Sequence, residues 1–245
     1  MAIDSEKVIS KLVGEIVEKN QQMISSSQNR EKFKSLVPFL MQKNIDDIDF
    51  TMFDHETRTH LLNALGAEHL KKGNIEASLK SFILASNRGA LNEIGDYYVS
   101  TYQHGKAIDA FKLAGDNAKL LELGKKCLTE GNLKSAIEAF KVINDKRSLL
   151  DAGDEALRMT KYEFAIEIYR ALENREKLVE VGKLCLSGND VQNAILAFQA
   201  AGEPEKLNDV GDLCLKNGSI KTALEVYQLA GNQMMSQFIQ QNFVK

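Results

Sequence analysis

The sequence predicts an all-α fold in which short helix–turn–helix units stack one after another, and three observations lead to this prediction. A glycine recurs six times with a 29-residue period, at Gly66, Gly95, Gly124, Gly153, Gly182 and Gly211. A small residue stands at position +12 from each glycine, and an aromatic residue stands at position +16. Self-similarity at a fixed period of about 20–50 residues is typical of solenoids, whose units bury their apolar faces only against neighbouring units.

The composition agrees with a folded, water-soluble chain. Of 245 residues, 44% are hydrophobic and 27% are charged, and the net charge is −3. Without a basic excess, we do not expect binding to nucleic acid through its phosphates. No apolar run reaches the roughly 18 residues of a membrane span, and residues 1–20 interleave charges with apolar residues, unlike a signal peptide.

The first predicted helix of each unit runs from about seven residues before the glycine to six after it. Leucine stands four residues before every glycine, and other apolar residues stand one before and four after it, which makes one apolar stripe. The leucines are Leu62, Leu91, Leu120, Leu149, Leu178 and Leu207. Glycines seven residues after the repeat glycine, at Gly73, Gly131 and Gly218, favour a left-handed helix end.

The second predicted helix is about ten or eleven residues long, too short to be stable alone. In the third unit its apolar stripe is Leu133, Ala136, Ile137, Phe140 and Ile143. Gly115, Gly202 and Gly231 are expected to end this helix. The residue that follows is Asn or acidic and can cap the next helix; these residues are Asn87, Asp116, Asp145, Asn174, Glu203 and Asn232.

A glycine inside a helix costs roughly 1 kcal/mol relative to alanine, so six of them indicate a steric reason. We expect each glycine to let the small residue at +12 on the second helix approach closely. These residues are Ser78, Ala107, Ala136, Ala165, Ala194 and Ala223. The aromatic residue at +16 would then fill the wedge toward the next unit; these are Phe82, Phe111, Phe140, Tyr169, Phe198 and Tyr227.

The offsets resemble the tetratricopeptide repeat over residues 61–240. The second unit matches its pattern with the following residues: Leu91, Ile94, Gly95, Tyr98, Ala107, Phe111 and Ala114. The resemblance implies a right-handed superhelical solenoid of about six units and a C-terminal capping helix. The period is shorter than that of the family, which is about 34 residues, and no tryptophan stands at −4. The repeats also look like the helical stretches of coatomer and intraflagellar-transport subunits, to which Gly153-Asp154, Ala165 and Tyr169 are similar.

Residues 1–60 do not follow the repeat and are expected to form a separate N-terminal helical segment before the array at 61–245. Apolar residues at three- and four-residue spacing predict an amphipathic helix from about Ser5 to Ile24. Pro38 should kink a second stretch, and residues 44–53 have a turn-like composition. The segment either caps the first unit or binds another chain, and a membrane-surface helix is disfavoured because its polar face mixes both charge signs.

A lone helix is predicted at 233–244. It either caps the array or leaves an edge for another copy, so a homodimer through the termini is one alternative.

The resembled family binds partners along a groove lined by its first helices. Five acidic residues stand two positions before the glycine and could form a ladder for a basic peptide: Glu93, Glu122, Asp151, Glu180 and Asp209. Alternatively they pair with lysines three residues earlier, as helix surfaces commonly do. The sign alternates one position after the glycine, which indicates charge pairing between units. At +2, Tyr97, Leu184 and Leu213 are apolar and are the candidate anchors.

Nothing in the sequence predicts catalysis, a cofactor or a metal. Cys127, Cys185 and Cys214 share one helical position with histidine, tyrosine and alanine in other units, which indicates packing; metal-binding CxxC spacing is absent. Thiols without an export signal predict a cytoplasmic protein. We therefore expect a non-catalytic scaffold for a peptide or partner helix. The alternative is a structural subunit that self-assembles through its N-terminal helix or its C-terminal end.

Overall fold

The computed structural model describes residues 36–243, and all regular secondary structure in this range is helical. Residues 36–40 are helical and are followed by the short 3₁₀ helix η1 (Ile45–Asp47). The α-helices are then α3 (His55–Lys71), α4 (Ile75–Leu84), α5 (Arg88–Ser100), α6 (His104–Ala114), α7 (Asn117–Thr129), α8 (Leu133–Val142), α9 (Lys146–Arg158), α10 (Tyr162–Ala171), α11 (Arg175–Ser187), α12 (Val191–Ala201), α13 (Pro204–Lys216), α14 (Ile220–Leu229) and α15 (Gln233–Phe243). The predicted all-α class is confirmed.

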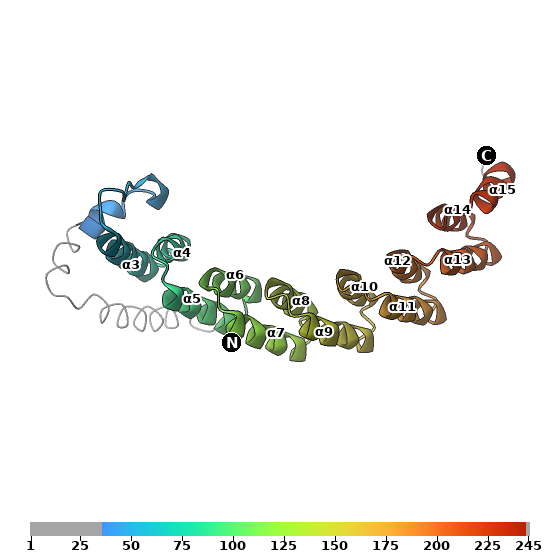
Figure 1. Ribbon diagram of the computed structural model, residues 1–245, viewed down its shortest axis with the longest axis horizontal. Coiled ribbons are helices and arrows are strands. Elements are labelled where there is room, and N and C mark those ends of the chain that lie inside the picture. The colour runs from blue at the N-terminus through green and yellow to red at the C-terminus, as the bar shows by residue number, and fades with distance from the viewer. Residues whose placement is uncertain (1–35, 244–245) are drawn as a thin grey trace. The chain divides into compact units, whose positions relative to one another are not determined.

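The chain divides into two compact bodies, and the division falls within α7, after Leu123. In each body, consecutive helices pack against each other. In the second body the helices form two layers, with α8, α10, α12 and α14 in one and α9, α11, α13 and α15 in the other (Figure 1). The expected boundary between residues 60 and 61 falls inside α3. This helix begins at His55 because the Asp54 carboxylate accepts a hydrogen bond from the Thr57 backbone N–H at 2.8 Å.

The lengths of the helices agree with the sequence pattern. The second helices α4, α6, α8, α10, α12 and α14 have 10 or 11 residues. Helices α5, α7, α9, α11 and α13 have 13 residues each. Because each is only three or four turns long, its stability depends on packing against its neighbours.

Every turn between two consecutive helices from α3 to α15 contains one residue in the left-handed backbone region. The glycines predicted to end helices occupy six of these positions, with φ from 66° to 77°. They are Gly73, Gly115, Gly131, Gly202, Gly218 and Gly231. The other six turns use Ser86, Tyr102, Asn144, Thr160, Glu173 and Asn189, with φ from 53° to 59°.

The capping residues predicted between units begin the next helix. Five of the six accept a hydrogen bond from the backbone N–H three residues later. They are Asn87, Asp116, Asp145, Asn174 and Asn232. Glu203 has no side-chain cap hydrogen bond, and there Pro204 occupies the start of α13 instead.

The nearest neighbour of each repeat glycine is an aromatic ring of the second helix, a contact that the sequence analysis did not predict. A Cβ atom added at any of the six glycines would lie within 2.8 Å of a ring carbon of the aromatic residue at +16. At Gly95, for example, the nearest atom is Cε1 of Phe111. The ring therefore packs directly against the bare backbone of the first helix in the same helix pair.

The small residues at +12 still pack in the interior. Ser78, Ala107, Ala136, Ala165, Ala194 and Ala223 are all fully buried, and the six aromatic side chains are at most 2% exposed. The leucines at −4 are at most 5% exposed. Each helix pair thus builds its part of the core from the same positions of the sequence pattern.

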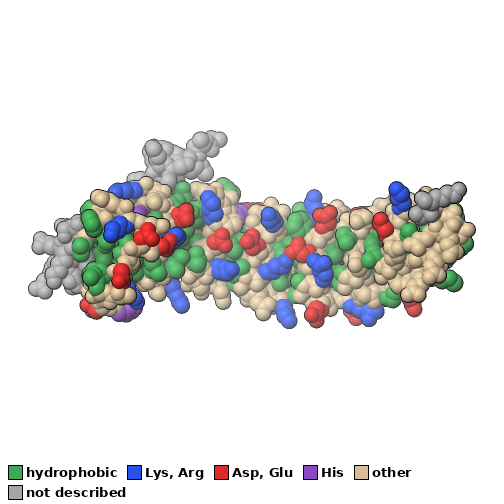
Figure 2. All heavy atoms as spheres, turned by 90° about the horizontal axis from the view of Figure 1, so that it is seen from above, with side chains coloured by type: hydrophobic (Ala, Val, Ile, Leu, Met, Phe, Trp, Pro, Cys, Tyr) green, Lys and Arg blue, Asp and Glu red, His purple; other side chains and the backbone are tan. Residues whose placement is uncertain are grey.

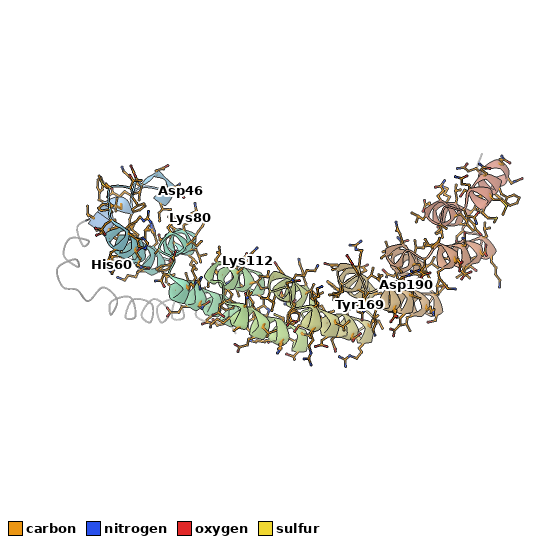
Figure 3. All side chains as sticks on the ribbon, viewed as in Figure 1. Asp46, His60, Lys80, Lys112, Tyr169 and Asp190 are labelled. Atoms are coloured by element: carbon orange, nitrogen blue, oxygen red, sulfur yellow. The ribbon has the colours of Figure 1, made fainter. Side chains whose placement is uncertain are left out.

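The described part of the N-terminal segment packs on the first repeat helix. Val37 lies in a cluster with Leu61 and Leu65 of α3, and Ile45 packs with Leu62 and Ala85. Asp46 and Lys80 form an ion pair at 2.8 Å, which can be followed in Figure 3. The helix continues through Pro38 within residues 36–40. The helix predicted at Ser5–Ile24 lies outside the described residues.

Candidate binding surfaces

The acidic residues predicted to line a groove lie on the first helices, and most of them are exposed. Glu122, Asp151, Glu180 and Asp209 are exposed, and Glu93 is half-buried. Lysines three residues earlier approach two of them, with Lys177 Nζ 3.2 Å from Glu180 and Lys206 Nζ 2.9 Å from Asp209. These two carboxylates are therefore partly neutralised within their own helix.

A second charge pairing links consecutive units, and its lysines stand five residues before a glycine rather than at the alternating position one after it. Lys119 Nζ lies 2.5 Å from the carboxylate of Asp96, and Lys177 Nζ lies 3.1 Å from that of Asp154. In both pairs an aspartate directly after one repeat glycine meets the lysine that stands five residues before the next one. Exposed pairs of this kind contribute about 0–1 kcal/mol each to stability.

Asp154 is the most strongly engaged of these carboxylates. It accepts a hydrogen bond from the Tyr169 hydroxyl at 2.7 Å in addition to its contact with Lys177. Burial acts to raise the pKa of Asp154, but the hydrogen bonds from Tyr169 and Lys177 outweigh it, so the pKa is lowered. Burial raises the pKa of Tyr169, and the bond to Asp154 adds to this effect. The ionised carboxylate and the neutral phenol are thus the stable pair.

The three apolar candidates differ in accessibility. Tyr97 is only 8% exposed, and its ring lies 5.6 Å from that of Tyr98, so it offers little surface to a partner. Leu213 is half-buried, whereas Leu184 is 42% exposed. Among the three, Leu184 is therefore the side chain with the most area available for contact.

A hollow of about 590 Å³ between α9 and α11 brings three of the predicted site residues together. Its lining consists of Asp151, Asp154, Leu157, Arg158, Lys177, Glu180 and Leu184. Asp209 and Leu213 lie on α13 and do not line it, and Glu93, Glu122 and Tyr97 belong to the first body. The hollow combines two leucines with three carboxylates and two basic groups.

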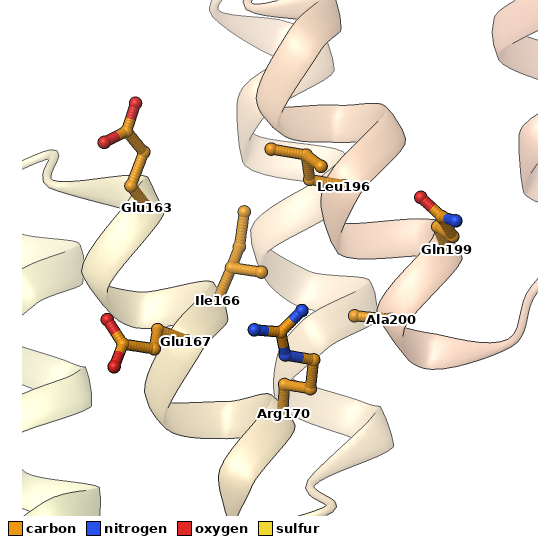
Figure 4. Close-up of a pocket in the computed structure, with 7 residues that line it drawn as sticks. All are labelled: Glu163, Ile166, Glu167, Arg170, Leu196, Gln199 and Ala200. Atoms are coloured by element: carbon orange, nitrogen blue, oxygen red, sulfur yellow. The ribbon is translucent and has the colours of Figure 1, made fainter.

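The opposite layer of the second body carries two more hollows. One lies between α10 and α12, measures about 510 Å³, and is lined by Glu163, Ile166, Glu167, Arg170, Leu196, Gln199 and Ala200 (Figure 4). The other, of about 430 Å³, lies between α8 and α10 and is lined by Lys134, Ile137, Glu138, Lys141, Val142, Phe164 and Glu167. Lys141 pairs with Glu167 of the next unit across this second hollow.

The sequence contains a signal for the hollows of this layer. Leu196 occupies position +14 from its repeat glycine, where the other units carry Lys80, Asp109, Glu138, Glu167 and Glu225. Phe164 occupies position +11 from its glycine, where no other unit has a large apolar residue. Leu196 is also 41% exposed. In both hollows, therefore, a lining residue departs from the repeat pattern.

Charge is evenly mixed on the visible surface. Figure 2 shows acidic and basic side chains interspersed on the face that it presents, without a broad field of one sign. Within residues 36–243, no helix is long and apolar enough to cross a membrane. In the same range, no cluster of three His, Cys, Asp or Glu side chains could hold a metal ion.

The three cysteines are buried. Burial raises the pKa of Cys127 and Cys185 to about 11 and also raises that of Cys214. Because the thiolate is the reactive form, these thiols are poor nucleophiles at neutral pH. Their position supports the packing interpretation.

No protein-family model matches this chain, and no curated protein is significantly similar to it.

Proposed function

We propose that the protein is a non-catalytic scaffold that binds a peptide or helix of a partner protein on the first-helix layer of its second body. The observation that carries this proposal is the hollow between α9 and α11, where the exposed Leu184 lies among carboxylates that the repeat pattern had already singled out. An accessible apolar side chain within a polar rim is the usual composition of a protein-binding site.

The architecture supports the same proposal. The helix pairs of both bodies repeat one set of contacts, from the glycine–ring contact to the capping residues. We infer that the repeat units form a right-handed superhelical solenoid similar to tetratricopeptide-repeat proteins, whose stacked helices present an extended binding surface. Buried thiols suit a reducing compartment, and we place the protein in the cytoplasm on this ground.

The composition of the hollow indicates the chemistry of the ligand. Lys177 is shared between Asp154 and Glu180, and Arg158 pairs with Glu155 on its own helix. Asp151 adds an exposed carboxylate at the same place. A segment with an apolar side chain for Leu157 and Leu184 and an adjacent lysine or arginine for the carboxylates would fit this surface.

A displayed library of random peptides, selected on the full chain, tests the proposal. We expect selected peptides to combine an apolar residue with a nearby basic one, and to bind Leu184→Asp at least about tenfold more weakly, since an anchor contributes about 1–2 kcal/mol or more. Leu113→Asp is the matched control, because Leu113 is 48% exposed on α6 in the other body. Equal binding to wild type and Leu184→Asp would contradict the proposed site.

A further inference from the structure

Helix α15 stands at the first-helix position of a seventh unit but lacks the residue that defines the other six. The position one full period after Gly211 is Gln240, and its side chain is exposed. At the six glycines, even a single added Cβ would lie within 2.8 Å of an aromatic ring. A second helix therefore cannot seat an aromatic residue on Gln240 in the way that the other second helices do on glycine.

The uncovered side of α15 is apolar. Met234 is 75% exposed, Phe238 is 50% exposed and Phe243 is 55% exposed. The rings of Phe238 and Phe243 contact each other edge to face, with their centroids 6.1 Å apart. Met234 and Phe238 are four residues apart and so lie on one face of the helix. Large apolar side chains gathered on one helix in this way mark an interaction surface.

The polar residues of α15 indicate what covers this face. Residues 233–243 contain no charged side chain, whereas α13 carries Glu205, Lys206, Asp209, Asp212 and Lys216. The polar side chains of α15 are mostly amides, at Gln233, Gln237, Gln240, Gln241 and Asn242. An amide both donates and accepts hydrogen bonds, so a surface of amides and apolar groups is complementary to itself. A charged partner would find no opposite charge on this helix.

We propose that the exposed face of α15 binds a second copy of the chain, with the two α15 helices packed around a twofold axis. In a twofold interface the same surface of each copy faces the other copy. Two faces of like charge would repel each other, whereas two uncharged faces do not. Phe238 lies at the centre of the contact and Met234 lies one turn away. This proposal concerns a different surface from the peptide site and does not depend on it.

The opposite side of α15 holds the helix in the fold, which allows the face to be altered without unfolding. Ile239 is fully buried and Ser236 is 8% exposed, and α15 packs on α14. The Asn232 side chain caps the helix by accepting a hydrogen bond from the Met235 backbone N–H at 3.1 Å. Substitutions at Phe238 touch none of these contacts.

Light scattering coupled to size-exclusion chromatography, over a wide range of concentrations of the full chain, tests the proposal. We expect the wild type to show the mass of a dimer, and Phe238→Glu to be monomeric with a dissociation constant at least about 100-fold higher, because two like charges would then face each other. An equimolar mixture of Phe238→Glu and Phe238→Lys chains should recover the dimer. Leu113→Glu, at a similarly exposed site on α6, should leave the dimer intact, and circular dichroism checks the fold of each variant.

Three outcomes would overturn the proposal. They are a wild type that stays monomeric at every concentration, a Phe238→Glu variant that dimerises as tightly as the wild type, and a mixture of the two oppositely charged variants that fails to associate.

Discussion

Two sets of positions in the repeat carry glycine, and they differ in how strictly glycine is required. In the middle of the first helix all six units have glycine, and each lies against an aromatic ring. In the left-handed turns only half of the positions have glycine, and the rest include Thr160 and Glu173. The turn glycines have open space around them, except for a loose contact of Gly131 with Met159 at 3.6 Å. In the turns, glycine is therefore favoured because of its backbone conformation. In the helices, glycine is required because a side chain would clash with the ring.

This difference shows whether steric exclusion or backbone preference restricts the choice of residue more strongly. A residue other than glycine in the left-handed region costs roughly 1–2 kcal/mol, which a folded domain can tolerate at a few exposed turns. An atom placed within 2.8 Å of a buried ring must displace the ring or the helix, and the packed interior has no room for either. Steric exclusion therefore keeps glycine in every unit, and backbone preference alone does not.

The largest expected effect comes from filling one of the steric positions. Gly95→Ala places a methyl group about where the Phe111 ring lies, and we expect it to lower the free energy of unfolding by about 3 kcal/mol. Gly115→Ala, at a turn with φ of 69° and no neighbour within 4 Å, should lower it by about 1 kcal/mol. Urea denaturation of both variants measures the contrast. Equal losses would show that the glycine–ring contact has no steric role.

A smaller effect is expected at Ser78, which occupies the +12 position of the first unit. Ser78 is fully buried, and its hydroxyl has no hydrogen-bond partner among the residues that the structure describes. Alanine occupies this position in the other units, so Ser78→Ala should raise the free energy of unfolding by about 1 kcal/mol. The reverse change one unit later, Ala107→Ser, should lower it by a similar amount. A thermal melt checks both, and a Ser78→Ala variant less stable than the wild type would refute the prediction.

In two units the aromatic residue that covers the glycine also donates a hydrogen bond to a carboxylate, Tyr169 to Asp154 and Tyr227 to Asp212. The first of these contacts predicts a pH dependence. The folded-state pKa of Asp154 is lowered, so its stabilising contribution is present above the ordinary aspartate pKa of about 4 and is lost as the pH falls below that value. Asp154→Asn should remove this part of the acid sensitivity. Because Asp154 is partly exposed, we expect an effect of at most about 1 kcal/mol.

Urea denaturation at neutral pH and at about pH 3 measures the Asp154 contribution. Tyr169→Phe keeps the ring against Gly153 but deletes the hydroxyl, and should flatten the same pH dependence in part. Identical losses on acidification in the wild type and Asp154→Asn would rule out the assignment.

The smallest expected effect lies at a turn. Thr160 has a β-branched side chain at φ of 56°, where branching is most strongly disfavoured. Thr160→Gly should raise the free energy of unfolding by about 0.5 kcal/mol. The substitution removes the backbone strain of the folded turn, but the greater conformational freedom of glycine in the unfolded chain offsets part of this gain. Gly131→Thr, at the equivalent turn of the preceding unit, should do the opposite. The midpoints of chemical denaturation report both changes, and a shift of the same sign in the two variants would contradict the explanation.

The sequence predicted the elements of the fold well and their contacts less well. The second-helix lengths, the left-handed glycine turns and the capping residues after each unit were all recoverable from spacing, because each depends on interactions within a few residues. The sequence did not predict that the ring at +16 lies next to the repeat glycine, because the packing of two helices decides this contact. Burial of Tyr97 was missed for the same reason.

The candidate site could be predicted only in part. The −2 and +2 offsets singled out Asp151, Glu180 and Leu184, which the structure brings to one hollow. The hollows of the opposite layer depend on the distances between helices α8, α10 and α12, which their packed side chains set. The spacing of residues along the sequence does not give those distances. Comparing each residue with its equivalents would have pointed to Phe164 and Leu196 but not to the hollows themselves.

By itself, the sequence determined the unit of this protein: a 29-residue period, two short amphipathic helices, and turns with defined caps. These follow from local backbone preferences and from the spacing of apolar residues, which act within one unit. The tertiary structure alone decided which ring covers each glycine, that Lys119 reaches Asp96 in the preceding unit, and that Met234 and Phe238 of α15 remain uncovered. Such contacts join residues far apart in the chain, and the shapes of packed helices select them.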